Sequence, residues 1–456
     1  MTRQPASVFP SDADIRDMLV RRIDLQAQGV GIVVGVIDRT GRRVITHGEM
    51  EKGGGRPVDG DTLFEIGSAT KAFTALLLAE MAERGEVGLD DPVDKYLPAG
   101  VTAPSRGGRQ ITLLDLATHT SGLPGMDPAV RTTDPERSRE LTGQAQALAD
   151  YTHERLYAFL SGYQLTGDVG SRYLYSNLGL GLLGHVLGLR AGIDFETLLA
   201  ERITGPLGMA DTVICPAEQQ HARLASGHDW RLQPVADMRL EVLAGAGALR
   251  STARDLLQFL AAELGYVETP LRAAMDAQLA PRRPTRLTRM QMALGWHATT
   301  TTTGEIVWHS GATVGSLSFL GFDRQRGCGV VVLNNTREAG DESLGWRLLS
   351  PGGSGSTRQL DPSHKLGAKA LERFVGRYGL ASGSILAVTR EADRLFAQLI
   401  LGGRAHSRPV REIFPLSPTR FGWGDASVEV TFVGEEQASG ILLHSAGGDR
   451  RGARLV

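Results

Sequence analysis

The sequence predicts an α/β protein in which both ends of the first 350 residues contribute to one sheet. Segments rich in β-branched and aromatic residues occur near the N-terminus and again after residue 305. Between them, about residues 90–235, the pattern is mainly helical and is interrupted by proline and glycine. Residues 363–456 have short strand-like segments, which predict a small C-terminal β-rich domain.

The N-terminal part begins with a predicted helix and a hairpin. Ser11 and Asp14 have the spacing of a helix start, and apolar residues recur at helical spacing to about residue 28. Residues 31–37 and 42–46 are strand-like and flank a turn that contains Gly41. A helical insertion then separates this hairpin from the later strands of the same sheet.

The later strands and a linker complete the predicted domain organisation. Residues 305–308, 316–322 and 329–333 have the composition of sheet strands. Residues 350–357 are rich in Ser and Gly, which is typical of a flexible connection. We therefore expect a domain at residues 1–350, a linker at 351–362 and the β-rich domain at 363–456.

Composition excludes several classes of protein. The chain has 456 residues, with 49 basic and 51 acidic side chains and no basic run, so a nucleic-acid partner is not expected. No stretch of about 18 apolar residues occurs, so a membrane is not expected as a partner either. Cys215 and Cys328 are far apart in apolar contexts, which predicts buried thiols rather than a disulfide or a metal site. The N-terminus lacks a signal-peptide core, which predicts a cytoplasmic protein.

The first candidate functional residues are Ser68 and Lys71, at the start of a long apolar helix over residues 68–81. Residues three apart on a helix are neighbours, so the lysine amine can reach the serine hydroxyl and take its proton. Unpaired N–H groups at the helix N-terminus favour negative charge on an attacked carbonyl. The alternative is a capping serine with a solvated lysine, because this spacing also occurs by chance.

Tyr175 and Asn177 form a second candidate group, in a loop before a helix rich in small residues. A tyrosine beside a lysine ammonium is a candidate base for the serine proton and a candidate acid for the leaving group. Asn177 offers a donor and an acceptor to a substrate amide or carbonyl. The alternative is a packed tyrosine with an asparagine turn.

The third group follows the strand that ends at Trp308. Here Ala312 offers a backbone N–H as an oxyanion donor, and Gly311 allows close approach of a substrate. His309 and Ser310 are candidates for polar contacts with the substrate. A single histidine beside a strand is more often structural.

Together, the sets Ser68-x-x-Lys71, Tyr175-x-Asn177 and His309-Ser310-Gly311 resemble, in this order, the motifs of serine β-lactamases and penicillin-binding proteins, especially the class C branch. Connecting segments also look like those of the family, among them His119-Thr-Ser-Gly-Leu-Pro124 and Asn334-Asn335. The resemblance covers about residues 12–340. It implies a mainly antiparallel sheet flanked by helices, with a helical subdomain and the active site between them.

The resemblance also implies a mechanism through an acyl-enzyme. Ser68 attacks an ester or amide carbonyl, Lys71 and Tyr175 share the proton transfers, and the N–H groups of Ser68 and Ala312 hold the oxyanion. No metal or organic cofactor is expected. The sequence is compatible with a monomer and with a homo-oligomer.

His309 departs from the family pattern, because many β-lactamases have a lysine there that binds a substrate carboxylate. We therefore expect a carboxylesterase acting on small esters or amides, with weak β-lactamase activity as an addition. The alternatives are a β-lactamase, D,D-carboxypeptidase or D-aminopeptidase, an acyltransferase, and a non-catalytic penicillin-binding sensor. With an ordinary pKa, His309 would gain a proton as the pH falls toward 6 and then favour carboxylate-bearing substrates.

Overall fold

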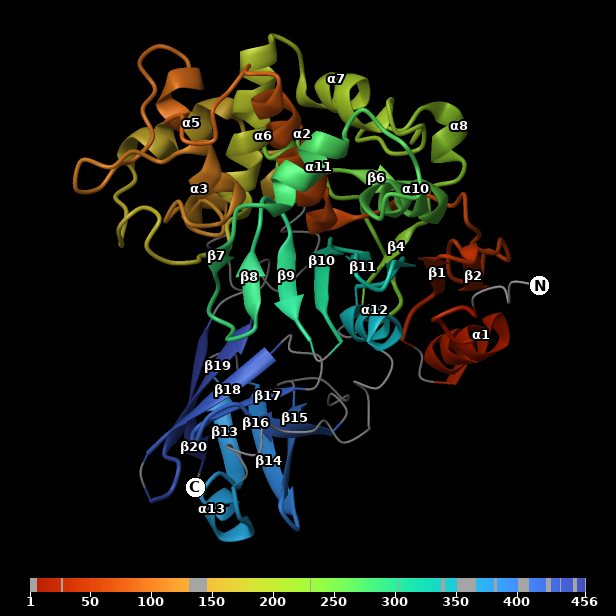
Figure 1. Ribbon diagram of the computed structural model, residues 1–456, viewed down its shortest axis with the longest axis vertical. Helices are drawn as coiled ribbons and strands as arrows, with labels where there is room; N and C mark the ends of the chain where they lie inside the picture. Colours follow the sequence, from red (N-terminus) through yellow and green to blue (C-terminus); the bar gives the residue numbers. More distant parts are fainter. Residues whose placement is uncertain are drawn as a thin grey trace. The chain divides into compact units, whose positions relative to one another are not determined.

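The computed structural model describes residues 6–25, 28–130, 146–229, 231–301, 303–337, 341–350, 366–380, 384–400, 410–423, 428–434, 436–445 and 449–455. The chain divides into two compact units (Figure 1). The first contains residues 1–284 and 291–349, and the second contains residues 285–290 and 350–456. The turn at 285–290 thus belongs to the second unit, although the sequence places it within the first. The predicted linker at 351–362 lies outside the described residues.

An eight-stranded sheet forms the centre of the first unit. Its strand order is β2-β1-β12-β11-β10-β9-β8-β7, and β1 pairs antiparallel with β12 from Ile32–Asn334 to Ile37–Gly329. The N-terminal hairpin and the late strands therefore share one sheet, as predicted. The strands of this unit are β1 (Gly31–Asp38), β2 (Gly41–Gly48), β3 (Phe64–Glu65), β4 (Gly227–His228), β5 (Pro234–Val235), β6 (Arg250–Ser251), β7 (Arg283–Pro284), β8 (Met290–Met292), β9 (His297–Thr300), β10 (Glu305–Ala312), β11 (Leu317–Asp323) and β12 (Cys328–Asn334).

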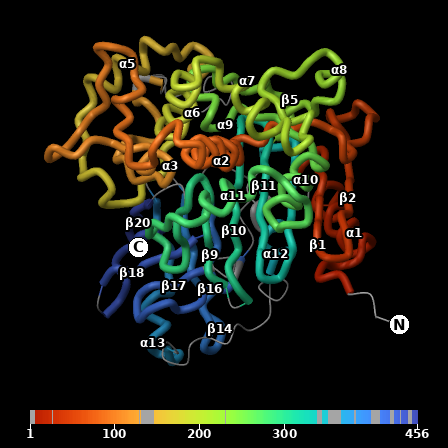
Figure 2. Tube along the Cα trace, turned by 45° about the horizontal axis from the view of Figure 1, so that its top comes forward, coloured from red at the N-terminus to blue at the C-terminus, as the bar shows by residue number. Residues whose placement is uncertain are grey.

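Helices cover both faces of this sheet. The strand register places Gly35 and Gly321 on opposite faces, because they pair with the neighbouring residues Val331 and Val330. A Cβ atom on Gly35 would lie 3.0 Å from Leu257 of α10 (Ala253–Glu263), and one on Gly321 would lie 3.0 Å from Leu349 of α12 (Asp341–Leu349). Helices α10 and α12 thus pack closely on the two faces, and the predicted arrangement of helices around an antiparallel sheet is confirmed (Figure 2).

Apart from α1, which packs beside β2, most of the remaining helices gather in a subdomain above one end of the sheet in Figure 1, around the buried helix α2. Ser11 caps the first helix of the chain through a capping box with Asp14, as predicted. The helices of this unit are α1 (Asp12–Val20), η1 (Arg21–Leu25), η2 (Gly67–Ala69), α2 (Thr70–Glu83), η3 (Val93–Tyr96), α3 (Leu113–Ala117), η4 (Pro128–Val130), α5 (His153–Gly162), α6 (Asn177–Ala191), α7 (Phe195–Leu199), η5 (Ala200–Thr204), α8 (Glu218–His221), α9 (Ala244–Gly247), α10 (Ala253–Glu263), α11 (Arg272–Leu279) and α12 (Asp341–Leu349).

The second unit is a closed barrel of eight antiparallel strands, in which each strand pairs with its sequence neighbour and the last pairs with the first. Closure leaves no unpaired strand edge. The expected C-terminal β-rich domain is confirmed. Its elements are α13 (Ala368–Glu372), β13 (Gly376–Leu380), β14 (Ile385–Glu391), β15 (Arg394–Ile400), β16 (Arg411–Pro415), β17 (Arg420–Trp423), β18 (Val428–Val433), β19 (Gly440–Ser445) and β20 (Arg450–Leu455).

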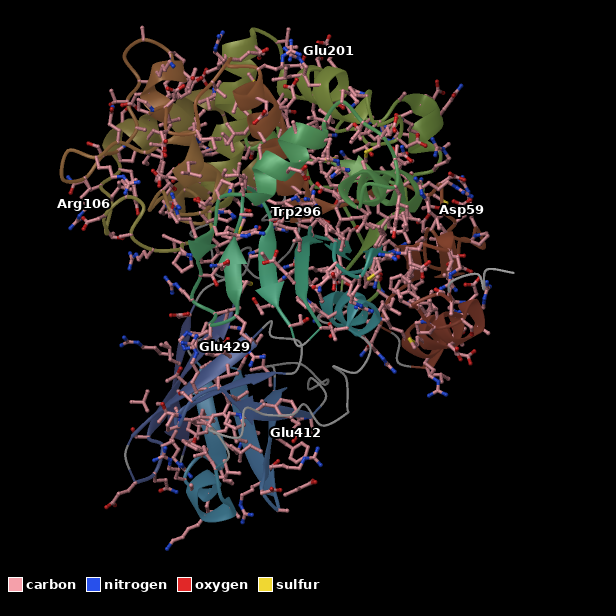
Figure 3. The ribbon with its side chains drawn as sticks, viewed as in Figure 1. Asp59, Arg106, Glu201, Trp296, Glu412 and Glu429 are labelled. Carbon is pink, nitrogen blue, oxygen red and sulfur yellow. The ribbon has the colours of Figure 1, made fainter. Side chains whose placement is uncertain are left out.

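Each unit has its own apolar core. Trp296, directly before β9, is fully buried and stacks on Phe259 (Figure 3 labels Trp296). In the barrel, Phe374 and Phe432 have ring centroids 4.6 Å apart. Within the described residues, no single helix is long and apolar enough to span a bilayer. The segment formed by α6, α7 and η5 together has the necessary length and composition, but it is bent by 84° between α6 and α7.

The two cysteines differ in exposure. Cys328 is buried, as predicted, but Cys215 is exposed, so the prediction of a buried thiol there is wrong. The apolar neighbours of Cys215 in the sequence do not cover it, because it follows β-bridge residue Val213 in a surface segment rather than a core strand.

Candidate active site

Ser68 and Lys71 lie together at the start of the helix that the sequence predicts. Ser68 is in the 3₁₀ turn η2, and Lys71 is in the first turn of α2. Lys71 is completely buried, and its Nζ atom lies 2.9 Å from Ser68 Oγ. The alternative of a solvated lysine is therefore wrong.

Lys71 has the surroundings of a neutral base. Its Nζ donates to Asn177 Oδ1 at 2.7 Å and to the Ala246 carbonyl at 2.6 Å. Burial lowers the pKa of Lys71 well below its ordinary value. A neutral amine has two N–H bonds and one lone pair, so with both N–H groups used the lone pair can accept the Ser68 hydroxyl proton.

Tyr175 and Asn177 lie beside this pair. Asn177 is the first residue of α6, and its backbone N–H donates to the Gly125 carbonyl. The Lys71 Nζ atom is 5.0 Å from the centroid of the Tyr175 ring. Both side chains are partly exposed, whereas Ser176 between them is buried and caps α6. The loop thus directs the two candidate side chains away from the core, toward Lys71.

The third candidate group lies within a strand and not after one. The sequence places the end of the strand at Trp308, but β10 continues to Ala312. Pairing with β9 stops at Trp308, so one side of residues 309–312 is open to other elements. Gly67 fills part of this side: its φ is +50°, and a Cβ atom on it would lie 2.7 Å from the Ala312 nitrogen.

The register shows where the Ala312 N–H points. Thr313 N donates to Ser316 O, and the next pair along the ladder is Ala312 with Leu317. Hydrogen-bonded and non-hydrogen-bonded pairs alternate in an antiparallel ladder, so the Ala312 N–H faces away from β11. It therefore points to the side on which η2 and Ser68 lie, which is the position of an oxyanion donor.

Gly311 has a packing role that the sequence does not predict. A Cβ atom there would lie 1.8 Å from the Ile66 carbonyl oxygen, so glycine is needed for the close approach of η2 to β10. Ser310, next to it, is partly exposed on the same strand.

His309 is buried, with 1% of its surface exposed, and it is not the titrating group that the sequence suggests. Its Nδ1 lies 2.6 Å from the Ser310 carbonyl, and its ring centroid is 5.0 Å from that of His297. Burial, and then the neighbouring His297 and Lys71, hold the pKa of His309 well below its ordinary value. The expectation that His309 gains a proton near pH 6 is therefore wrong.

The structure adds groups that sequence patterns did not identify as site residues. The Ala246 carbonyl binds Lys71, and a backbone acceptor leaves no side-chain signal in a sequence. His119 stacks on Tyr175, with ring centroids 4.4 Å apart. The segment around His119 resembles a connecting segment of the family, but only the structure shows the contact of His119 with Tyr175. Burial lowers the pKa of His297 to about 3, and Tyr173 contacts its Nε2 at 3.1 Å.

The site can supply a nucleophile, a base and an oxyanion donor from one cluster of side chains and backbone. Among the residues that the structure describes, no group of three or more His, Cys, Asp or Glu is arranged to hold a metal ion. The chemistry for which this arrangement is suited is acyl transfer through Ser68.

Known proteins are similar to this chain in sequence and in fold. The family model described as Beta-lactamase matches residues 16–354. The D-alanyl-D-alanine-carboxypeptidase/endopeptidase AmpH of Escherichia coli is 32% identical over 257 residues, 56% of this chain and 63% of AmpH. Penicillin-binding protein 4* of Bacillus subtilis is 26% identical over 424 residues, 88% of this chain and 89% of that protein. A solved class C β-lactamase has a TM-score of 0.64 at 21% identity, covering 76% of this chain and 97% of its own.

These findings assign the protein to a class. The chain belongs to the β-lactamase family, the serine hydrolase family that includes class C β-lactamases and penicillin-binding proteins. The alignment spans less than two thirds of AmpH, whereas the match to penicillin-binding protein 4* extends over nearly the whole chain. The family resemblance of the sequence is thus confirmed.

Proposed function

We propose that the protein is a serine hydrolase that cleaves esters or amides of small, uncharged substrates through an acyl-Ser68 intermediate, as a carboxylesterase does. The observation that supports this proposal most directly is the distance of 2.9 Å between the buried amine of Lys71 and Ser68 Oγ. Lys71 takes the serine proton, and the N–H groups of Ser68 and Ala312 bind the oxyanion. Tyr175 then delivers a proton to the leaving group. In the second half of the cycle its phenolate takes a proton from the water that attacks the acyl group, and Lys71 returns its proton to Ser68 as the acid leaves.

The preference for an uncharged substrate rests on His309. At this position the chain has an imidazole whose pKa is lowered by burial, so it stays neutral at physiological pH. A neutral ring gives no charge-assisted bond to a substrate carboxylate, a contact worth about 1.5–3 kcal/mol. Esters and amides without a carboxylate therefore lose no binding energy through the absence of a charge at position 309.

A second candidate is β-lactam or D-alanyl peptide hydrolysis, and one observation favours it. Arg337 donates from Nη1 to the Thr313 carbonyl at 2.7 Å, one residue beyond Ala312, so a guanidinium lies at the same end of β10. Such a group can bind a carboxylate in place of a lysine. AmpH is named as a D-alanyl-D-alanine carboxypeptidase, which agrees with this candidate.

One panel of substrates tests both candidates. The purified protein and its Ser68→Ala variant are assayed with p-nitrophenyl esters, a chromogenic cephalosporin and a D-alanyl-D-alanine peptide. We expect Ser68-dependent ester turnover with a kcat/KM above that for the other two. A higher value for the cephalosporin or the peptide would select the second candidate, and turnover retained by Ser68→Ala would remove Ser68 from the mechanism.

A further inference from the structure

His119 has an unusual backbone for its residue type. Its φ is +57°, in the left-handed region, and its side chain is completely buried in the loop after α3. This conformation is unfavourable for a residue with a Cβ atom, so the surrounding contacts must hold it there. Those contacts lead to Tyr175.

Three contacts connect His119 with the loop that carries Tyr175. Its backbone carbonyl accepts from Leu174 N–H at 2.7 Å, and its Nδ1 accepts from Ser176 N–H at 3.0 Å. Between these two anchors, the imidazole packs on the Tyr175 ring with centroids 4.4 Å apart and planes at 34°. One residue thus fixes the backbone on both sides of Tyr175 and one face of its ring.

The protonation state of His119 is consistent with such a role. Because Nδ1 accepts a hydrogen bond, the neutral ring carries its proton on Nε2. Burial, followed by the nearby Lys71, lowers the pKa of His119 well below its ordinary value. The neutral form therefore persists, and a proton on Nδ1 would oppose the Ser176 N–H.

His119 has no direct access to a substrate. Its Nε2 atom is buried and has no hydrogen-bond partner among the residues that the structure describes. The ring lies edge to face with Tyr173, at 5.7 Å and 83°. An effect of His119 on turnover must therefore act through the residues that it holds.

We propose that His119 is a positioning residue that keeps the phenol of Tyr175 in the orientation needed for proton transfer. This inference rests on the proposed function, because it assigns His119 a part in the same acyl-enzyme cycle. The loop could otherwise move the phenol by an ångström, a displacement that costs about 100-fold in rate. The neighbouring Lys71 is also held by the Ala246 carbonyl, which lies outside the loop that His119 anchors.

A double-mutant cycle tests the proposal with a matched pair of variants. His119→Asn and His119→Gly both tolerate the left-handed backbone. The asparagine keeps an acceptor for Ser176 N–H but removes the ring, whereas the glycine removes both. We expect kcat for a p-nitrophenyl ester to fall about 10-fold in His119→Asn and about 100-fold in His119→Gly, with KM nearly unchanged.

The same substitutions are then made in Tyr175→Phe, where the hydroxyl to be positioned is absent. We expect them to change kcat by less than about 2-fold in this background. Equal losses in both backgrounds would overturn the proposal and leave His119 with a general structural role. If the wild type shows no Ser68-dependent turnover, the proposed function fails instead.

Hydrogen exchange gives a readout that does not depend on activity. The amides of residues 174–176 should exchange faster in His119→Gly, whereas the Ser176 amide should stay protected in His119→Asn. Unchanged exchange in both variants would show that His119 does not hold this loop, and would overturn the proposal whatever the activity.

Discussion

The Nζ atom of Lys71 and the Oγ atom of Ser68 lie 2.9 Å apart, and the lysine is completely buried while the serine is partly exposed. This difference in exposure separates two tasks. The serine can meet a substrate, whereas the lysine is desolvated and its amine is held by Asn177 and Ala246. The pair thus has the geometry of a nucleophile and its base.

Replacement of Lys71 should remove the base without removing the nucleophile. We expect Lys71→Ala to slow modification of Ser68 by a fluorophosphonate by about 100- to 10,000-fold. Lys71→Arg is the matched control, because a guanidinium is long and polar and carries a charge but cannot accept a proton. The rate of Ser68 labelling should fall by about the same factor in both variants. Fast labelling in Lys71→Arg would show that the lysine acts through its charge alone.

The pH dependence of labelling follows from the lowered pKa of Lys71. The neutral amine is the active form and predominates above the folded-state pKa, so the rate should fall as the pH decreases through that value. An ordinary lysine, with a pKa near 10.4, would instead give a rate that rises up to about pH 10. Labelling rates from pH 5 to 10 should reach a plateau well before pH 10. A continuous rise to pH 10 would show that burial does not lower this pKa.

Tyr175→Phe should reduce kcat by about 100-fold or more, which is the scale for a lost general acid or base. The variant keeps the ring that packs on His119, so the fold should stay intact. Steady-state turnover, with circular dichroism as a control, measures both effects. An unchanged kcat would leave Tyr175 as a packing residue.

Removal of the barrel should leave a first unit in which Ser68 is still labelled. The turn at residues 285–290 is grouped with the barrel, where Thr288 N donates to Glu429 at 3.1 Å and Arg286 lies 3.0 Å from Asp449 (Figure 3 labels Glu429). A chain ending at Leu349 loses these partners. We expect labelling within about 3-fold of the full chain, because a domain has its own core. Trypsin should then cut after Arg286 or Arg289, which it should not do in the full chain. An insoluble truncation would show that the barrel is needed for folding.

The sequence predicts the parts of the site that depend on local geometry. Ser68 and Lys71 are three residues apart at a helix start, so their contact follows from helical spacing. The parts that it misses depend on distant segments. The Ala246 carbonyl reaches Lys71 from a residue 175 positions away, and it leaves no pattern of side chains.

Burial is the other property that local patterns do not provide. His309 follows Trp308 in a strand, and a strand residue can face water or the core. Only the structure shows that its side chain is buried, with its ring beside those of His297 and Tyr175. For the same reason, the expected ordinary pKa of His309 is wrong.

The closure of the barrel also depends on distant segments. Its strands are visible in the sequence, but the barrel closes through the pairing of β13 with β20, about 75 residues apart.

His309 offers the last prediction, because the proposed preference for substrates without a carboxylate rests on it. In the wild type, the imidazole stays neutral at pH 6, since burial and two neighbouring groups lower its pKa. The ratio of kcat/KM for a carboxylate-bearing cephalosporin to that for a neutral p-nitrophenyl ester should therefore be constant between pH 6 and 8. A rise of this ratio at pH 6 would show that His309 is protonated there and contacts the carboxylate.

His309→Lys tests the same position with a charge. A lysine ammonium paired with the carboxylate contributes about 1.5–3 kcal/mol, so the ratio should rise roughly 10- to 100-fold over that of the wild type. His309→Gln is the matched control, because it keeps a polar side chain without a charge and should leave the ratio within about 2-fold. The lysine ammonium loses its hydration at a buried position, which destabilises the folded state, so the Tm of His309→Lys should fall below that of His309→Gln. A bound carboxylate-bearing inhibitor should restore part of this loss, because it pairs the charge. If the ratio is the same in both variants, the side chain at position 309 does not reach the substrate carboxylate.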